Sequence, residues 1–87
     1  MAPPGGHYSH ATVANGLVFV SGQLPITPSG DLLNQASFEA QVKQTLSNVQ
    51  AVLEAAGSDV TRLVQVRVYI TSISHWPIFN QIYKEWA

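Results

Sequence analysis

One long amphipathic pattern constrains the fold of this chain more than any other feature of its sequence. Apolar residues recur at intervals of four, four, three and four: Phe38, Val42, Leu46, Val49 and Leu53. These intervals place them along one side of an α-helix. Gly57 follows the last of them and suits a left-handed helix end. The pattern therefore predicts a helix over about 36–56, whose apolar side must be covered by other elements.

A β-hairpin is expected ahead of this helix. Asn15 and Gly16 separate two apolar runs, and both residues tolerate the positive φ of a type I′ turn. The pair predicts strands over about 9–14 and 17–23. Residues 17–20 are apolar without alternation, so we expect the second strand to be covered on both faces.

A third strand is expected after the long helix, because apolar and polar side chains alternate over residues 63–70. Its apolar face would consist of Val64, Val66, Val68 and Ile70. We expect a charge at Val66 to prevent folding.

A second helix is expected over about 75–86. Ser74 is a candidate cap, and Pro77 is tolerated in the first turn. The apolar stripe of this helix consists of Phe79, Ile82, Tyr83 and Trp86.

The order strand-strand-helix-strand-helix predicts a single α/β (α+β) domain over residues 1–87, with helices on one face of a sheet. Three strands under two helices leave at least one sheet edge unpaired. We expect either another chain to supply the missing pairing or the natural protein to continue beyond residue 87. Apolar residues make up 46% of the chain and charged residues 10%. This balance favours a folded protein that covers part of its surface with copies of itself.

The charges argue against nucleic acid as a partner. The formal net charge is -1, and the basic residues Lys43, Arg62, Arg67 and Lys84 are scattered along the chain, whereas phosphate backbones require clustered positive charge. The absence of cysteine excludes thiol nucleophiles and zinc–thiolate sites. The first residues lack the pattern of a secretory signal, and no apolar run approaches the roughly 20 residues that span a bilayer. We therefore expect a cytoplasmic protein without a membrane partner.

Four residues are candidate ligand contacts. Ser21 and Gly22 end an apolar strand abruptly, where serine offers a donor and an acceptor and glycine permits close approach. Asn80 lies among aromatic and aliphatic residues of the second helix, although asparagine is a poor helix former. The ring of Tyr8 could close an apolar pocket. Each position also has a purely structural explanation: a strand leading into a loop, a tie between helix and loop, or ordinary packing.

The remaining titratable residues suggest no metal or acid–base site. His7 and His10 would lie on opposite faces of a strand and could not easily share a metal. His75 lies far along the chain, and we interpret all three histidines as ordinary polar positions. Glu39 and Glu54 fall on the polar side of the long helix, where we expect solvent to surround them.

Several ordered motifs together resemble a known family. Gly6 to Ala11 (GHYSHA) is similar to its GPYSQA segment, and Leu17 to Gln23 (LVFVSGQ) to its second strand with the SGQ signature. Leu46 to Gly57 (LSNVQAVLEAAG) resembles its first helix. Val64 to Thr71 and Phe79 to Tyr83 resemble its third strand and second helix. The family is that of the reactive intermediate deaminases, RidA/YjgF, also described as L-PSP endoribonucleases and translation inhibitors.

The resemblance implies a chorismate-mutase-like fold, β-β-α-β-α-β-β, of which this chain lacks the C-terminal strands. It also implies a homotrimer with ligand clefts between subunits. The implied reaction is that of a 2-iminobutanoate/2-iminopropanoate deaminase, which hydrolyses reactive 2-imino or enamine acids to 2-oxo acids and ammonia without a cofactor. By the same resemblance, Tyr8 would form the cleft wall, Ser21 and Gly22 its floor, and Asn80 would support the binding loop.

One departure from the family pattern bears on activity. In the family, an arginine in a P-x-R motif clamps the substrate carboxylate and a glutamate near the C-terminus places the water. Both would fall beyond Ala87, so no catalytic residue is assigned within this chain, and we expect the natural protein to be longer. The alternatives are a non-catalytic trimer that binds small carboxylic acids or acts as a regulator, and, with less support, an endoribonuclease or translation inhibitor.

Overall fold

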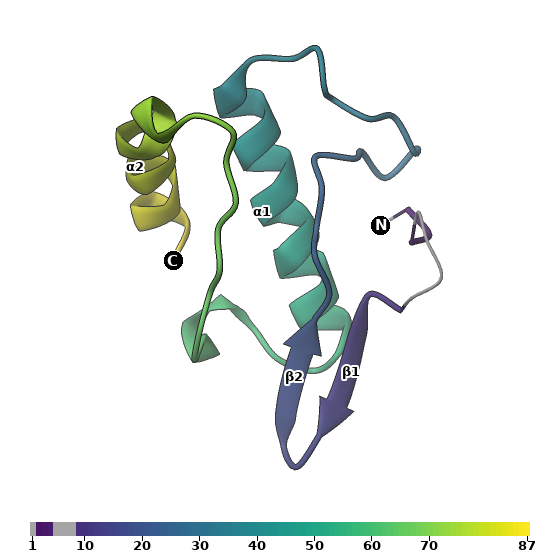
Figure 1. The fold of residues 1–87 in the computed structure, drawn as a ribbon. Coiled ribbons are helices and arrows are strands. Elements are labelled where there is room, and N and C mark those ends of the chain that lie inside the picture. Colours follow the sequence, from purple (N-terminus) through teal and green to yellow (C-terminus); the bar gives the residue numbers. More distant parts are fainter. Residues whose placement is uncertain (1, 5–8) are drawn as a thin grey trace.

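The computed structural model describes residues 2–4 and 9–87 of the chain, and helix α1, Phe38–Ala55, runs through its middle (Figure 1). The Ser37 hydroxyl caps this helix by accepting a hydrogen bond from the amide of Ala40 at 3.1 Å. This bond satisfies one of the free amides at the helix start. The long helix predicted from the apolar spacing is confirmed, with ends slightly inside the expected bounds.

The other end of α1 closes in the way that Gly57 predicts. Gly57 has a φ of 84°, and its amide donates to the carbonyl of Glu54 at 3.0 Å. The amide of Ser58 donates to the carbonyl of Leu53 at 2.8 Å. These two bonds form a Schellman motif, which requires a left-handed residue where the glycine lies.

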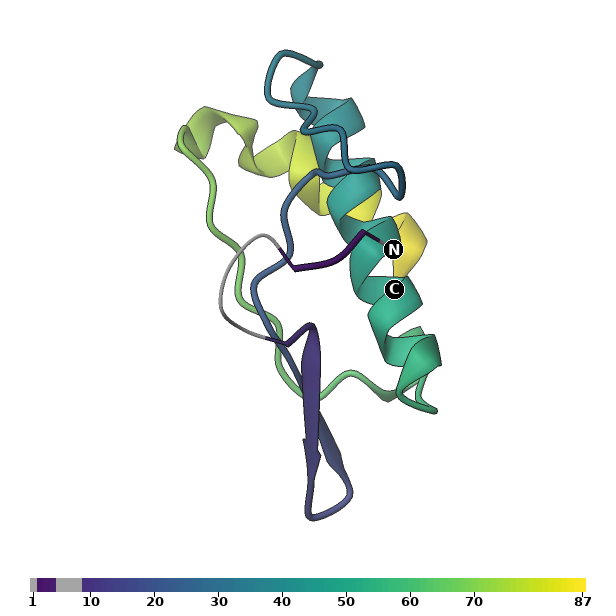
Figure 2. The same cartoon turned by 90° about the vertical axis from the view of Figure 1, so that its right-hand side faces the viewer.

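The predicted hairpin is also confirmed. Strand β1, Ala11–Ala14, pairs antiparallel with strand β2, Leu17–Val20, and both strands are shorter than expected. Asn15 and Gly16 have φ values of 51° and 76°, as a type I′ turn requires. Figure 2 shows the hairpin extending past the end of α1.

The expectation that β2 is covered on both faces is wrong. Leu17 and Phe19 are 47% and 55% exposed, whereas Val18 and Val20 are half-buried. Only one face of the strand rests against the rest of the chain, so burial alternates although the sequence does not.

The predicted third strand is wrong as well. Residues 63–70 form no strand, and in Figure 1 they run as an extended segment between α2 and the chain that continues from β2. Alternation favours an extended backbone, but a strand also needs a neighbour for its amides and carbonyls. No such neighbour is present among the described residues. Val64 is 85% and Val66 43% exposed, so the premise that a charge at Val66 would enter a buried face is wrong. Val68 is the residue of this face that packs against the core.

Asp59 closes the turn that leads from α1 into this segment. Its carboxylate accepts hydrogen bonds from the hydroxyl and the amide of Thr61, at the start of the short 3₁₀ helix η1, Val60–Arg62. The hydroxyl bond above all, then the amide bond and the nearby Arg62 guanidinium, lower the pKa of Asp59 from its ordinary value.

Helix α2, Trp76–Trp86, follows the short 3₁₀ helix η2, Ile73–His75, and has Pro77 in its first turn as predicted. Ser74 does not cap it. The hydroxyl of Ser74 is hydrogen-bonded to that of Ser72 at 2.7 Å, because the 3₁₀ turn places the helix start after His75 rather than after Ser74.

The core lies between the two helices. Val42 and Leu46 of α1 are buried against Phe79 of α2. Half-buried apolar side chains surround this cluster: Phe38, Val68, Ile82, Tyr83 and Trp86. A hairpin and two packed helices make an α+β fold, which confirms the predicted class. Among the helices of the described chain, none combines the length and the apolar character needed to cross a membrane.

Candidate functional site

The segment after β2 is tied to the start of β1 at Ser21. The amide of Ser21 donates to the carbonyl of His10 at 2.9 Å, and its hydroxyl donates to the carbonyl of Ser9. These bonds continue the hairpin pairing one step beyond the strands and fix the serine at the point where the apolar run ends. Because the hydroxyl donates its one proton to the carbonyl of Ser9, its oxygen has lone pairs with which it can accept a hydrogen bond.

Gln23 and His10 extend this network. The Gln23 amide nitrogen donates to the carbonyl of Ser21 at 3.2 Å and contacts Nδ1 of His10 at 3.3 Å. Nε2 of His10 lies 2.6 Å from the carbonyl of Ala2, which can only accept, so Nε2 carries the proton. With that proton on Nε2, Nδ1 is the ring atom that accepts from Gln23. His10 therefore links two chain segments.

Gly22 is the second residue predicted to form the site floor. Its backbone conformation does not require glycine. Its φ lies outside the left-handed region, and a Cβ added to it would meet no heavy atom of the described residues within 4 Å. The position leaves open space beside a segment that hydrogen bonds hold in place.

Asn48 belongs to the same region, although it is not among the residues predicted from the sequence to form the site. It is a buried polar side chain on α1, 8% exposed. Its amide nitrogen donates to the carbonyls of Leu24 and Ile26, at 2.9 and 2.8 Å, just after Gly22. Its place one turn before the apolar Val52, on the same side of the helix, could have indicated burial, but no sequence pattern indicates its partners.

The other two predicted contacts do not join this region within the described chain. Asn80 is exposed on α2, and the extended segment runs between α2 and the continuation of β2 in Figure 1. Tyr8 lies outside the described residues. The ligand roles of Tyr8, Ser21, Gly22 and Asn80 stay predictions.

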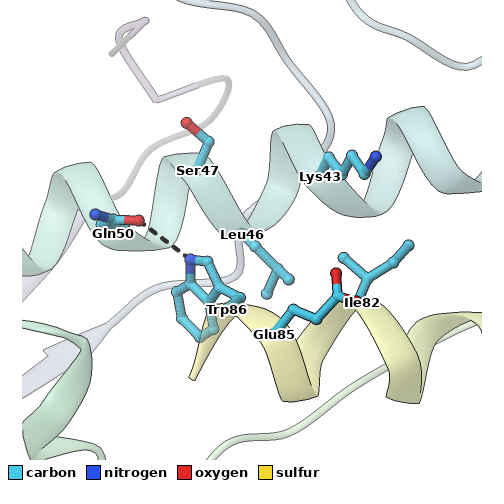
Figure 3. Close-up of a pocket in the computed structure, with 7 residues that line it drawn as sticks. All are labelled: Lys43, Leu46, Ser47, Gln50, Ile82, Glu85 and Trp86. Carbon is cyan, nitrogen blue, oxygen red and sulfur yellow. Dashed lines mark hydrogen bonds between the residues drawn. The ribbon is translucent and has the colours of Figure 1, made fainter.

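A separate groove of about 260 Å³ lies between α1 and α2 (Figure 3). Leu46 and Ile82 point toward each other at its centre, and the indole nitrogen of Trp86 donates to Gln50 at 3.2 Å along one side. Lys43, Ser47 and Glu85 complete the lining. Ser21, Gly22 and Asn80, the predicted ligand contacts that the structure describes, do not line this groove.

The titratable side chains outside this region have structural roles or face solvent. The His75 ring packs on Phe38 with centroids 4.4 Å apart, and Glu39 pairs with Lys43 on the exposed side of α1. Glu54 is exposed as predicted. Within the part of the chain that the structure describes, no three acidic or histidine side chains gather as metal ligands.

Comparison with known proteins defines the class of this chain. The family model described as Endoribonuclease L-PSP matches residues 1–87. Protein HMF1 of Saccharomyces cerevisiae is 38% identical over 79 residues, which cover 91% of this chain and 60% of that protein. The human 2-iminobutanoate/2-iminopropanoate deaminase is 33% identical over 81 residues, or 93% of this chain and 59% of that protein. The chain therefore belongs to the L-PSP endoribonuclease family, the RidA/YjgF family that its motifs resemble.

Solved structures agree with this assignment. The crystal structure of RidA from an Antarctic Psychrobacter species superposes with a TM-score of 0.91 at 32% identity, over 99% of this chain and 70% of that one. The chain spans about 60 to 66% of the length of the first curated relatives that it matches.

Proposed function

We propose that this protein hydrolyses reactive 2-imino or enamine acids to 2-oxo acids and ammonia. The observation that carries the proposal is its 33% identity to the human 2-iminobutanoate/2-iminopropanoate deaminase over 93% of the chain. The bovine protein of the same name, at 32% identity, adds support. We also propose that the protein works in the cytoplasm as a homotrimer, whose clefts between subunits hold the ligand.

This hydrolysis requires few catalytic groups from the protein. The carbon of an imine is electrophilic once its nitrogen is protonated, so the site has to hold the acid, exclude bulk solvent and place one water. Water adds to that carbon and gives up a proton, which leaves an amino alcohol. Once the nitrogen of this adduct is protonated, the carbon–nitrogen bond breaks, the carbonyl of the 2-oxo acid forms and ammonia leaves. The fixed Ser21 hydroxyl suits the holding role, because an oxygen that donates its proton to Ser9 keeps the capacity to accept a hydrogen bond from the protonated imine nitrogen.

The site residues follow from the family resemblance. Tyr8 would form the cleft wall, Ser21 and Gly22 its floor, and Asn80 would support the binding loop. The open space beside Gly22 is compatible with a ligand there. The carboxylate of the acid would be held by the arginine of the family motif, which would follow Ala87. No cofactor is required for this reaction.

The test uses imines generated in place by a threonine or serine dehydratase. The full-length protein should speed the release of ammonia and the formation of 2-oxobutanoate. Asn80→Ala should slow this turnover, and the control Gln81→Ala, which removes the neighbouring exposed amide of α2, should not. Imine loss no faster than in buffer would count decisively against the proposal.

A second candidate is the cleavage of RNA, because the matching family model is described as an endoribonuclease. The basic residues argue against it: Lys43, Arg62, Arg67 and Lys84 are scattered along the sequence, and Lys43 is paired with Glu39 at 3.1 Å. RNA cleavage that persists through purification and is lost with a single side chain would favour this candidate. A non-catalytic trimer would instead bind small carboxylic acids without turnover.

A further inference from the structure

Asn48 connects helix α1 to the segment that follows β2. Each of its polar groups has a partner. The two N–H groups donate to the carbonyls of Leu24 and Ile26, and the oxygen accepts from the side-chain nitrogen of Gln44 at 2.9 Å. A buried polar side chain with all groups satisfied fixes its partners strongly, because breaking any bond leaves an unpaired group out of water.

The two carbonyls differ in their other partners. The carbonyl of Leu24 also accepts from the amide of Ile26 at 2.7 Å, whereas among the described residues the carbonyl of Ile26 accepts from Asn48 alone. An asparagine amide supplies two N–H donors from one atom, which is what two neighbouring carbonyls require. Aspartate and leucine have nearly the same size but no such donor.

The same segment carries Ser21 and Gly22. The segment is held at Ser21 by the hydrogen bonds to Ser9 and His10. After Gly22 it is held by the hydrogen bond from Asn48 to Leu24. Two anchors a few residues apart leave the backbone at Gly22 little freedom to move relative to α1.

We propose that Asn48 is a positioning residue for the ligand site. It acts through the backbone of Leu24 and Ile26 to hold Ser21 and Gly22 where a 2-imino or 2-oxo acid contacts them. The identity of the ligand rests on the proposed function, whereas the positioning rests on the hydrogen bonds of Asn48.

The test compares Asn48→Asp with Leu53→Ala in the full-length protein. Asn48→Asp keeps the size of the side chain and removes both donors. Leu53→Ala removes buried methyl groups of the same helix, which costs stability but leaves the bonds to Leu24 and Ile26 in place. Gln44→Ala is the milder second variant, because it frees the Asn48 side chain without removing its donors.

Two readouts separate positioning from stability. Asn48→Asp should raise KM for the imino acid about tenfold and leave kcat within about twofold, as expected for lost ground-state binding. Amide hydrogen exchange at Ser21 and Gly22 should become faster in this variant. Leu53→Ala should change neither readout below its unfolding temperature. If Asn48→Asp does not fold, Gln44→Ala decides, with an expected rise of about threefold in KM.

Unchanged KM in the folded Asn48→Asp variant would overturn the inference, whether or not exchange becomes faster. An equal rise in KM in Leu53→Ala would also overturn it, because the effect would then follow stability alone. A wild-type protein that neither hydrolyses imines nor binds 2-oxobutanoate would refute the proposed function instead, and with it the ligand that Asn48 is proposed to serve.

Discussion

Replacing Gly22 with alanine distinguishes a glycine that the fold needs from one that a ligand needs. The backbone of Gly22 is outside the left-handed region, and an added Cβ would meet no heavy atom of the described residues within 4 Å. Alanine therefore brings neither strain nor a clash. Because alanine also restricts the unfolded chain, Gly22→Ala should leave the free energy of unfolding unchanged or raise it by up to about 1 kcal/mol.

Gly57 provides the matched control. A Cβ there would also meet no described atom within 4 Å, but its φ of 84° is one that alanine adopts with strain. The strain costs about 1 to 2 kcal/mol, partly offset in the unfolded chain, so Gly57→Ala should lose about 1 kcal/mol. For a domain of this size the loss lowers Tm by roughly 4 to 8 °C.

Urea and thermal unfolding measure both variants, and the deaminase assay measures KM. We expect Gly22→Ala to keep or raise the wild-type Tm and to raise KM, because the new methyl group occupies space that the ligand uses. If Gly22→Ala loses as much stability as Gly57→Ala, the reasoning about the backbone is refuted. If both its Tm and its KM are those of the wild type, Gly22 does not lie at a ligand.

Two further predictions concern stability. Val68→Asp should cost at least about 2 kcal/mol, because Val68 packs on the core, whereas Val66→Asp, at a position 43% exposed, should cost less than about 1 kcal/mol in urea unfolding; equal losses would contradict this ranking. Because the pKa of Asp59 is lowered in the folded state, its ionised form stabilises the fold at neutral pH. This contribution is lost as the pH falls below 3.8, the ordinary pKa of the group, toward the lower pKa of the folded state. The stability difference between the wild type and Asp59→Asn, followed by circular dichroism, should therefore close in acid, and a gap that widens there would reverse the argument.

Local sequence patterns predict the elements that depend on local bonds. Consecutive residues of the apolar stripe of α1 lie about one helix turn apart, and the helix end at Gly57 is formed by bonds within the last turn. The hairpin turn depends only on the φ values of Asn15 and Gly16. The strand predicted over residues 63–70 is wrong because a strand depends on more than local bonds. Alternation sets an extended shape, but pairing depends on a neighbour that no local pattern specifies.

The residues of the candidate site also differ in whether the local sequence indicates them. Ser21 can be identified in the sequence because a serine and a glycine end an apolar run, and in the structure it is hydrogen-bonded to Ser9 and His10. Asn48 is hard to find because its partners are backbone carbonyls more than 20 residues earlier in the chain. Asparagine at a helical position indicates only that some bond is favoured, and not where its partner lies.

The hydrogen bond of Ser21 predicts its chemical role. A serine nucleophile needs a base that takes its proton, and the carbonyl of Ser9, which accepts that proton's hydrogen bond, is not such a base. Ser21 should therefore hold the substrate while water attacks. We expect Ser21→Ala to raise KM about tenfold with a modest fall in kcat.

The size of the effect in this variant decides between the two roles. Loss of a serine nucleophile in a hydrolase lowers kcat by about a millionfold, far more than the loss of one binding contact. Steady-state kinetics at saturating imino acid separates these outcomes, and thermal unfolding of Ser21→Ala checks that the hairpin survives the loss of the Ser9 bond. A fall in kcat of more than about a thousandfold in a folded variant would mean that Ser21 attacks the substrate, and would require a base that approaches its hydroxyl once the ligand is bound.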